Sequence, residues 1–415
     1  MKKSAKLSLT LALMMGITGG VQLMDTNTAS AEVSDKFRLE LNGVTSYYHD
    51  TSHNYYGQTR TDSTRLGKGW NNYTRAQLTY YIDKDTKAVA RLHSGYDNAG
   101  DFAKNSNSTG AYFDQSFLQW DDRKNDMHYL VGKRGMTLGQ SMVYNSTGNL
   151  TGVQASWGNW WGDRCLQLTY GDNKSGDRIF SAQLTGKTSK ATSLNATFVR
   201  GEKMYENYAK YTKTKYQLNN LPDAKEGETL QAYVERLQTG EFSKNPATAN
   251  ELKTLTQAAY TSRDVDRFID FGGKVKFHGV TLVGEWAYNL SNVTLHGNVN
   301  SPDARRGYFV ELYTGPTNDF GSGLPLQKVG THAFSFRYQN IGQYGSYVHN
   351  NTFYDDKEGF RLDYGVVVKK GLSVDFVYGR MKDKGTLQTK YDNQNDVHKG
   401  DWSNIYVLAL NYKFR

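Results

Sequence analysis

The chain has 415 residues, a formal net charge of +9, one cysteine and 13% aromatic residues, among them 30 tyrosines. Beyond the N-terminal segment no run approaches the ~20 apolar residues of a transmembrane helix, which excludes a helical membrane protein. The lone Cys165 excludes an internal disulfide and a cysteine metal cluster, and we expect no cofactor. No clustered Lys/Arg tract is present, so the charge favours pore or surface electrostatics over nucleic-acid binding.

Residues 1–31 are expected to be a signal peptide. Lys2, Lys3 and Lys6 form a charged start, an apolar run covers Leu7–Thr18, and Ala29-Ser30-Ala31 offers a cleavage site of small residues. The spacer before that site is long, so the exact bond stays open. An uncut anchor is disfavoured because the apolar run is too short to span a membrane. We expect export, and a single barrel domain over residues 32–415.

The remaining chain reads as about sixteen strands with alternating apolar and polar faces. In the first, Phe37, Leu39 and Leu41 oppose polar neighbours. The phase of residues 111–120 is ambiguous, which allows a bulge. The expected strands are Phe37–Tyr48, Tyr73–Asp83, Lys87–Tyr96, Ala111–Trp120, Met127–Arg134, Thr151–Trp157, Cys165–Gly171, Arg178–Gly186, Thr192–Arg200, Arg267–Phe277, Val280–Asn289, Gly307–Tyr313, His332–Asn340, Gly359–Val368, Leu372–Tyr378 and Asn404–Arg415.

The connections between these strands alternate short and long. Short turns fall at residues 84–86, 186–190, 278–279 and 369–371, on one side of the sheet. Long connections fall on the other side, and only Thr314–Gly330 is long where a short turn is expected. This asymmetry is typical of a transmembrane antiparallel up-and-down β-barrel with short periplasmic turns and long external loops. The low mean hydropathy of −0.69 is compatible, because only alternate residues face lipid.

The longest interruption, residues 201–266, is expected to be a partly helical insertion. Leu230, Tyr233, Val234 and Leu237 recur at helical spacing, and a second short helix is indicated near residues 252–255. Two interpretations stay open. The insertion is either a surface loop that packs its own helices or a lid folded over a channel mouth.

The sequence resembles the bacterial outer-membrane porins. The resemblance is carried by the signal segment, the hairpins Leu78–Leu92 and Leu362–Phe376, and the terminal strand ending Tyr412-Lys413-Phe414-Arg415. It implies a homotrimer of sixteen-stranded barrels whose third external loop enters the lumen. By order that loop is Gly135–Asn149, with candidate constriction residues Met136, Leu138, Gln140, Met142 and Tyr144. The loop is neutral, whereas the typical porin constriction loop is acidic and faces a basic wall.

The resemblance also implies that outer-membrane assembly machinery reads the last strand. Porins usually end on an aromatic residue, whereas here Arg415 follows Phe414, which leaves the identity of that machinery open. The outward residues that such machinery would contact are Tyr406, Leu408, Leu410, Tyr412 and Phe414.

Charged residues recur on the strand faces opposite the apolar ones. Inward-facing charge in a wide barrel tunes which ions enter. We predict a basic wall segment with a mild anion preference, or alternatively arginines that are each neutralised by a nearby carboxylate. The predicted pore-lining residues are Arg38, Glu40, Arg75, Lys87, Arg91, Glu285, Glu311, Arg337, Arg361, Asp363 and Asp375.

These patterns favour a water-filled channel for passive diffusion of small hydrophilic solutes and ions in the outer membrane of a diderm bacterium. A channel specific for a sugar or an anionic nutrient is the main alternative. A barrel enzyme is disfavoured because nine scattered histidines and no hydrolase, zinc-protease or P-loop motif define no catalytic group. A secreted β-adhesin would need a second packing layer, and a plugged transporter would need a plug domain before the first strand.

Overall fold

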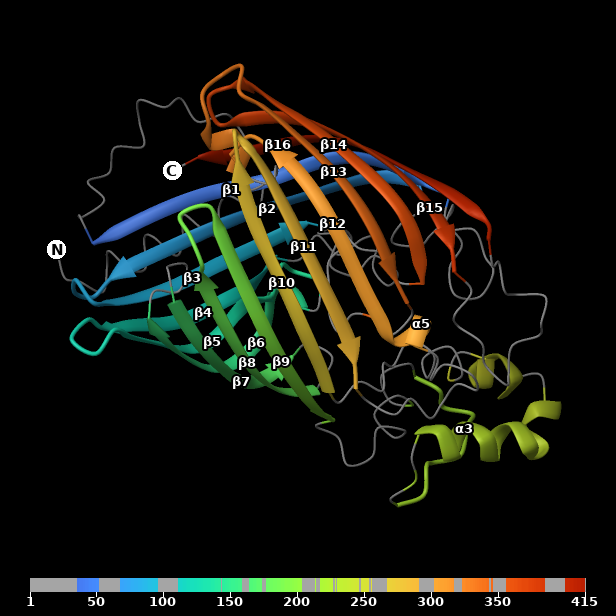
Figure 1. Cartoon of the computed structure of the whole chain (residues 1–415). Helices are drawn as coiled ribbons and strands as arrows, with labels where there is room; N and C mark the ends of the chain where they lie inside the picture. The colour runs from blue at the N-terminus through green and yellow to red at the C-terminus, as the bar shows by residue number, and fades with distance from the viewer. Residues whose placement is uncertain are drawn as a thin grey trace.

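The chain forms a closed antiparallel β-barrel of sixteen strands in the computed structural model (Figure 1). Each strand pairs with its neighbours in sequence, and β1 also pairs with β16, which closes the barrel. The predicted fold class is therefore confirmed. The strands are β1 Phe37–Asp50, β2 Lys68–Tyr81, β3 Thr86–Gly95, β4 Ala111–Asp122, β5 Met127–Leu138, β6 Tyr144–Gly158, β7 Arg164–Asn173, β8 Asp177–Lys187, β9 Thr192–Lys203, β10 Arg267–Phe277, β11 Val280–Asn289, β12 Arg306–Thr314, β13 His332–Ile341, β14 Lys357–Lys369, β15 Leu372–Asp383 and β16 Trp402–Phe414.

The structure describes residues 36–51, 68–95, 111–142, 144–158, 164–173, 177–203, parts of 213–255, 267–290, 302–316, 323–342, 345, 356–384 and 400–414. The expected signal peptide, residues 1–31, lies outside them, as do most residues of the long connections.

The two faces of the wall differ in polarity, as strand alternation requires. In β13, Phe334, Phe336 and Tyr338 are exposed on the outer face, while Ser335 and Arg337 alternate with them and are buried on the inner face. The same apolar exposure continues around the barrel. It produces an outer band suited to lipid and an inner face that carries polar groups.

The two ends of the barrel differ in the length of their connections, as predicted. The described strand bounds leave residues 82–85, 123–126, 188–191, 278–279 and 370–371 as short turns at one end. The opposite end carries the connections 51–67, 96–110, 204–266, 290–305, 342–356 and 384–401, with 139–143 and 174–176 as short exceptions. By the barrel rule these are the periplasmic and external ends. Figure 1 shows the start of β1 and the end of β16 at the left, and α3 at the lower right beyond the external strand ends.

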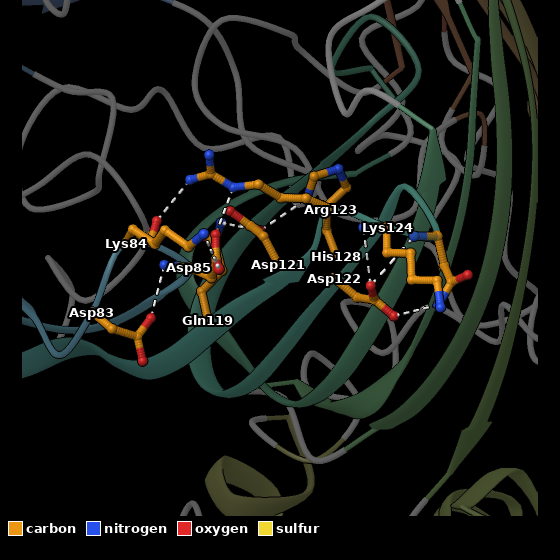
Figure 2. Close-up of polar contacts among 10 residues, drawn as sticks. Asp83, Lys84, Asp85, Gln119, Asp121, Asp122, Arg123, Lys124 and His128 are labelled. Atoms are coloured by element: carbon orange, nitrogen blue, oxygen red, sulfur yellow. Dashed lines mark hydrogen bonds and ion pairs between the residues drawn. The ribbon is translucent and has the colours of Figure 1, made fainter.

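Two periplasmic turns are joined by an ion pair. The Arg123 Nε atom lies 2.5 Å from Asp85, and its Nη2 donates to the Lys84 carbonyl at 2.8 Å (Figure 2). On the same rim, the His128 Nδ1 atom lies 2.8 Å from Asp121. The Arg123 contacts connect the β2–β3 turn to the β4–β5 turn, and the His128 contact joins β4 to β5.

The long insertion after β9 contains its own small core. The predicted helix is present as α3, Leu230–Thr239, followed by η2, Glu241–Lys244, and residues 248–253 are also helical. None of the described helices is long and apolar enough to cross a membrane. The buried residues of this core are Leu218, Leu221, Tyr233, Val234, Leu237, Leu252 and Leu255. The described part of the insertion therefore packs its own helices, as the surface-loop interpretation expects.

Candidate pore and constriction site

The hairpin of β5 and β6 extends further than the sequence indicated. The predicted connection Gly135–Asn149 is wrong as a loop, because strand pairing resumes after a bulge between Arg134 and Met136 and continues to the pair Leu138–Tyr144. Only residues 139–143 join the strands. We call residues 139–142 the hairpin tip. The sequence did not predict this extension, because Thr137, Gly139 and Ser141 are residue types common in loops. The extension depends instead on strand pairing that continues past the bulge.

The hairpin tip is hydrogen-bonded to the inner wall by side chains of distant strands. The Glu285 carboxylate accepts the backbone N–H of Gln140 at 2.9 Å and that of Met142 at 2.8 Å. The Gln183 Oε1 accepts the N–H of Gly139 at 2.6 Å. The wall therefore holds the tip by three of its backbone N–H groups.

A second chain of polar contacts runs beside this carboxylate. The Gln140 side chain donates to Asn195 Oδ1 at 2.7 Å, and Asn195 donates to Asp270 Oδ1 at 3.0 Å. Gly139, at φ +60°, faces these carboxylates, since a Cβ there would lie 2.1 Å from Glu285 Oε1. Only glycine combines this backbone conformation with this close approach. β8, β9, β10 and β11 thus form one docking wall for the tip.

An apolar cluster inside the barrel supports the same contact. It joins the hairpin to inward-facing positions of β8 to β13, so the docked hairpin and the wall share one buried core. Its members are Met136, Leu138, Met142, Leu150, Ile179, Val199, Phe268, Val283, Ala287, Phe309 and Ile341. This apolar cluster lies beside the polar contacts between the tip and the docking wall.

The five predicted constriction residues divide between strand and tip. Met136 and Leu138 lie in β5 and are buried, and Gln140 and Met142 lie in the tip. Tyr144 begins β6 and pairs with Leu138, and its side chain lies outside the described residues. Their role in limiting a pore remains a prediction.

On the far side of the ring, β2, β3 and β4 bring two arginines to one carboxylate. Arg91 donates to Asp114 from Nε at 2.8 Å and from Nη2 at 2.6 Å. The Arg75 Nε atom lies 3.4 Å from Asp114 and donates to His93 Nδ1 at 2.9 Å. Two guanidinium groups and one carboxylate give Arg75, Arg91 and Asp114 together a net charge of +1.

Three rings stack across the same strands. The His93 ring lies 5.5 Å from Tyr73 and 5.1 Å from Tyr112, centroid to centroid, and both pairs are stacked. The Arg75 guanidinium lies 4.5 Å from the Tyr73 centroid. His93 is fully buried, whereas Tyr112 is 45% exposed. We call the two arginines, Asp114 and these three rings the basic wall.

The other predicted pore-lining residues lie on inward positions of their strands, mostly in ion pairs. Arg337 donates to Glu311 at 2.7 Å, and Arg361 donates to Asp363 at 2.6 Å. Glu40 lies 3.1 Å from Lys413 and 3.8 Å from Arg38. Asp375 accepts the Ser373 hydroxyl at 3.2 Å. Lys87 shares the inward register of Arg91, and Glu285 belongs to the docking wall.

Asp114, Asp270, Asn195 and Gln183 are the residues that the sequence reasoning missed. Alternation could have placed Asp270, which lies between the outward Ile269 and Phe271. Asp114 was hidden by the bulge opposite Arg91 and Leu92, which shifts the phase of β4. No sequence signal links residues 140 and 285, which only the closed ring brings together.

A closed antiparallel barrel of sixteen strands, with short turns at one end and long connections at the other, is a porin-like transmembrane architecture. The resemblance stated from the sequence is thus confirmed for the fold.

Comparisons with solved structures return outer-membrane barrels at low identity. A variant of the Rh. blastica porin is 10% identical with a TM-score of 0.45, covering 91% of this chain and all of that chain. Salmonella typhi OmpF in complex with daunomycin is 11% identical with a TM-score of 0.47, covering 91% and 97%. A loop-deletion mutant of OmpT from Vibrio cholerae is 9% identical with a TM-score of 0.45, covering 92% and 100%. No family model and no curated protein sequence matches the chain. The assignment of the fold therefore rests on the strand topology of this chain.

Proposed function

We propose that the protein is an outer-membrane porin that forms a water-filled channel for passive diffusion of small hydrophilic solutes and ions. The observation that carries this proposal is the division of the lumen. The hairpin tip is fixed to the docking wall on β8–β11, while charged side chains occupy the opposite wall on β16 and β1–β4. A sixteen-stranded barrel is wide enough for an aqueous channel, so a tip fixed on one side leaves a polar passage along the other.

The charge on the open side supports a mild anion preference. Two arginines share Asp114, and Arg38 and Lys413 share Glu40, so each group carries one excess positive charge. By contrast, Arg337 and Arg361 each lie beside one carboxylate. The two expectations from the sequence thus apply to different strands. Excess positive charge applies to β16 and β1–β4, and neutralisation applies to β12–β14.

A sugar-selective or anion-selective channel is the second candidate. The ring stack of Tyr73, His93 and Tyr112 favours it, because an exposed aromatic ring beside arginines suits the apolar face and hydroxyl groups of a sugar. Saturable block of ion current by a maltodextrin or a sugar phosphate would support this alternative. Current that stays unchanged at all sugar concentrations would support the general channel.

We further propose that the barrel assembles as a homotrimer through the outer face of β1–β4. Mid-strand outward positions there are small or polar, and the Asn72 side chain donates to Thr45 Oγ1 at 3.1 Å. β10–β16 instead present large apolar groups such as Phe271, Phe334 and Leu408. Polar groups are unfavourable toward lipid, so the first face suits a protein contact. The native mass in detergent tests this. Asn72→Trp should give monomers, Phe336→Trp on the other face should not, and a monomeric wild type would contradict the proposal.

The outer face of the last strand supports a proposal about assembly. Tyr406, Leu408, Leu410 and Phe414 are exposed on the outer face, where assembly machinery would meet them, and Tyr412 contacts the Thr74 hydroxyl on the same face. We also propose that residues 1–31 direct export and that the barrel then inserts into the outer membrane. Deletion of residues 1–31 should leave the protein in the cytoplasm, and outer-membrane fractionation measures it.

Single-channel conductance in a planar bilayer tests the channel itself. Purified, refolded protein should give stable, ohmic current steps. Under a salt gradient, the reversal potential should shift toward the equilibrium potential of the anion. Folded, heat-modifiable protein that never conducts would overturn the porin proposal. Incubation with phospholipid or peptide substrates provides the parallel test for catalysis, and turnover there would favour an enzyme.

A further inference from the structure

The connection between β12 and β13 is the one long segment at the periplasmic end, and it does not stay between its own strands. It contains the short helix η3, Leu324–Leu326, which contacts β14, β15 and β16. The Pro325 carbonyl accepts the backbone N–H of Gly371, in the β14–β15 turn, at 3.1 Å. Adjacent strands lie roughly 4.8 Å apart, so the segment crosses about 10–15 Å of the wall.

This segment lies on the inner side of the wall. Leu324 is fully buried and packs with Ala333 and Val367, which alternate with outward residues and therefore face inward. Gly365, also inward, provides the space, since a Cβ there would lie 2.6 Å from Leu324 Cδ2 and 2.7 Å from Asp375 Oδ1. A leucine anchored on inward-facing residues places its backbone within the cross-section of the barrel.

The segment is fixed along its described length by hydrogen bonds. The Gln327 N–H donates to the Leu324 carbonyl at 3.0 Å, and Gly330 donates to the Val367 carbonyl at 2.8 Å. The Val367 N–H in turn donates to the Thr331 carbonyl at 3.0 Å. Leu326 and Val329 extend from this frame and are 38% and 61% exposed. The frame therefore presents two apolar side chains from a rigid backbone.

We infer that residues 323–331 form a second constriction, at the periplasmic exit, which limits permeation in series with the hairpin tip. This inference rests on the proposed channel function. The two elements occupy different walls, with the tip on β8–β11 and the exit segment on β14–β16. A solute that passes the tip beside the basic wall then meets Leu326 and Val329, so the exit selects against bulk while the basic wall selects for charge.

Chemical modification of an introduced cysteine during single-channel recording tests the inference without unfolding the segment. In a Cys165→Ser background, Val329→Cys is reacted with a bulky cationic methanethiosulfonate added from the periplasmic side. We expect a stepwise loss of single-channel current. Lys190→Cys, which is exposed in the β8–β9 turn, is the matched control and should react with no loss. Complete modification at residue 329 with unchanged current would overturn the inference.

A pair of substitutions tests the anchor. Leu324→Ser should release the segment and raise the conductance, while Leu326→Ser, in the same helix but half exposed, should raise it less. Equal conductance in Leu324→Ser and the unmodified protein would contradict a constriction at the exit. The proposed function fails separately, since a protein that lacks a channel gives no current before any modification.

Discussion

The docking wall and the basic wall are made by the same kind of strand, yet they use their inward charges in opposite ways. On β10 and β11, both carboxyl groups are buried at the hairpin tip. Glu285 accepts backbone N–H groups of the tip and Asp270 accepts the Asn195 side chain, so these groups serve positioning. On β2–β4, Asp114 sits between two arginines and leaves positive charge on the wall. An inward carboxyl group therefore acts as an anchor where its donors are amide groups and as a charge balance where its donors are guanidinium groups.

The difference teaches that burial alone does not identify a structural carboxylate. Asp114 and Glu285 are almost equally buried, and only their partners distinguish them. Substitutions on the docking wall should change the geometry of the passage, whereas substitutions on the basic wall should change its charge. The following predictions test that separation.

The largest effect is expected for Gly139→Ala. A methyl group at this position would overlap Glu285 and Asp270, so the tip should leave the docking wall and the conductance should rise with added noise. Gly279→Ala is the matched control, because its φ is also positive, at +83°, while nothing lies within 4 Å of the added carbon. Both changes cost about 1–2 kcal/mol of backbone strain, and only the first should alter single-channel current. Identical currents in the two variants would contradict the docking of the tip.

Glu285→Gln should give a similar but smaller change. The amide keeps the size of the side chain but offers one acceptor oxygen where the carboxyl group offers two. One of the two backbone hydrogen bonds, to Gln140 or to Met142, is therefore lost, at a cost of about 0.5–1.5 kcal/mol. We expect a lower unfolding temperature and an open-channel current that fluctuates more. Both can be measured on refolded protein. Asp375→Asn, on the inner face of β15, is the comparison for loss of one inward carboxylate away from the tip.

Neutralising Arg75 and Arg91 should change selectivity more than conductance. The variant Arg75→Gln/Arg91→Gln leaves Asp114 without its two cations, so the reversal potential should move toward cations. The double variant Arg361→Gln/Asp363→Asn removes a pair of opposite charges and should leave the potential unchanged. Equal shifts in both variants would show that selectivity does not depend on the basic wall.

The smallest effect is expected in the external insertion, away from both walls. Arg236 donates to Glu228 at 2.7 Å and 2.8 Å, which lowers the pKa of that carboxyl below its usual value. A lowered pKa contributes stability above the unfolded value, near 4.5, and that contribution is lost as the pH falls through the folded value. Proteolysis of the insertion should therefore increase below pH 4.5, by a small factor because solvent reaches Arg236 and screens the pair. Glu228→Gln should remove the dependence.

The sequence predicted the fold from alternation and from the lengths of connections, because both are local. Strand periodicity separated Phe334, Phe336 and Tyr338 from Ser335 and Arg337 without knowledge of any partner. The docking of the hairpin tip could not be predicted in the same way. It depends on ring closure, which brings Gln140 and Glu285 together, and on a bulge that turns the end of β5. The exit segment was visible only as an anomaly, a long connection where a short turn was expected.

The pairing of β1 with β16 has a consequence for biogenesis. Leu41 lies opposite Phe414, so the seam joins the first and the last strand of the barrel in sequence order. Until residues 402–414 arrive, β1 has an unpaired edge that can recruit a foreign strand. Contacts of such sequence separation also form slowly. The nascent polypeptide therefore needs an escort that covers this edge between export and insertion, and a chain truncated before β16 should be cleared by proteases as an unclosed precursor.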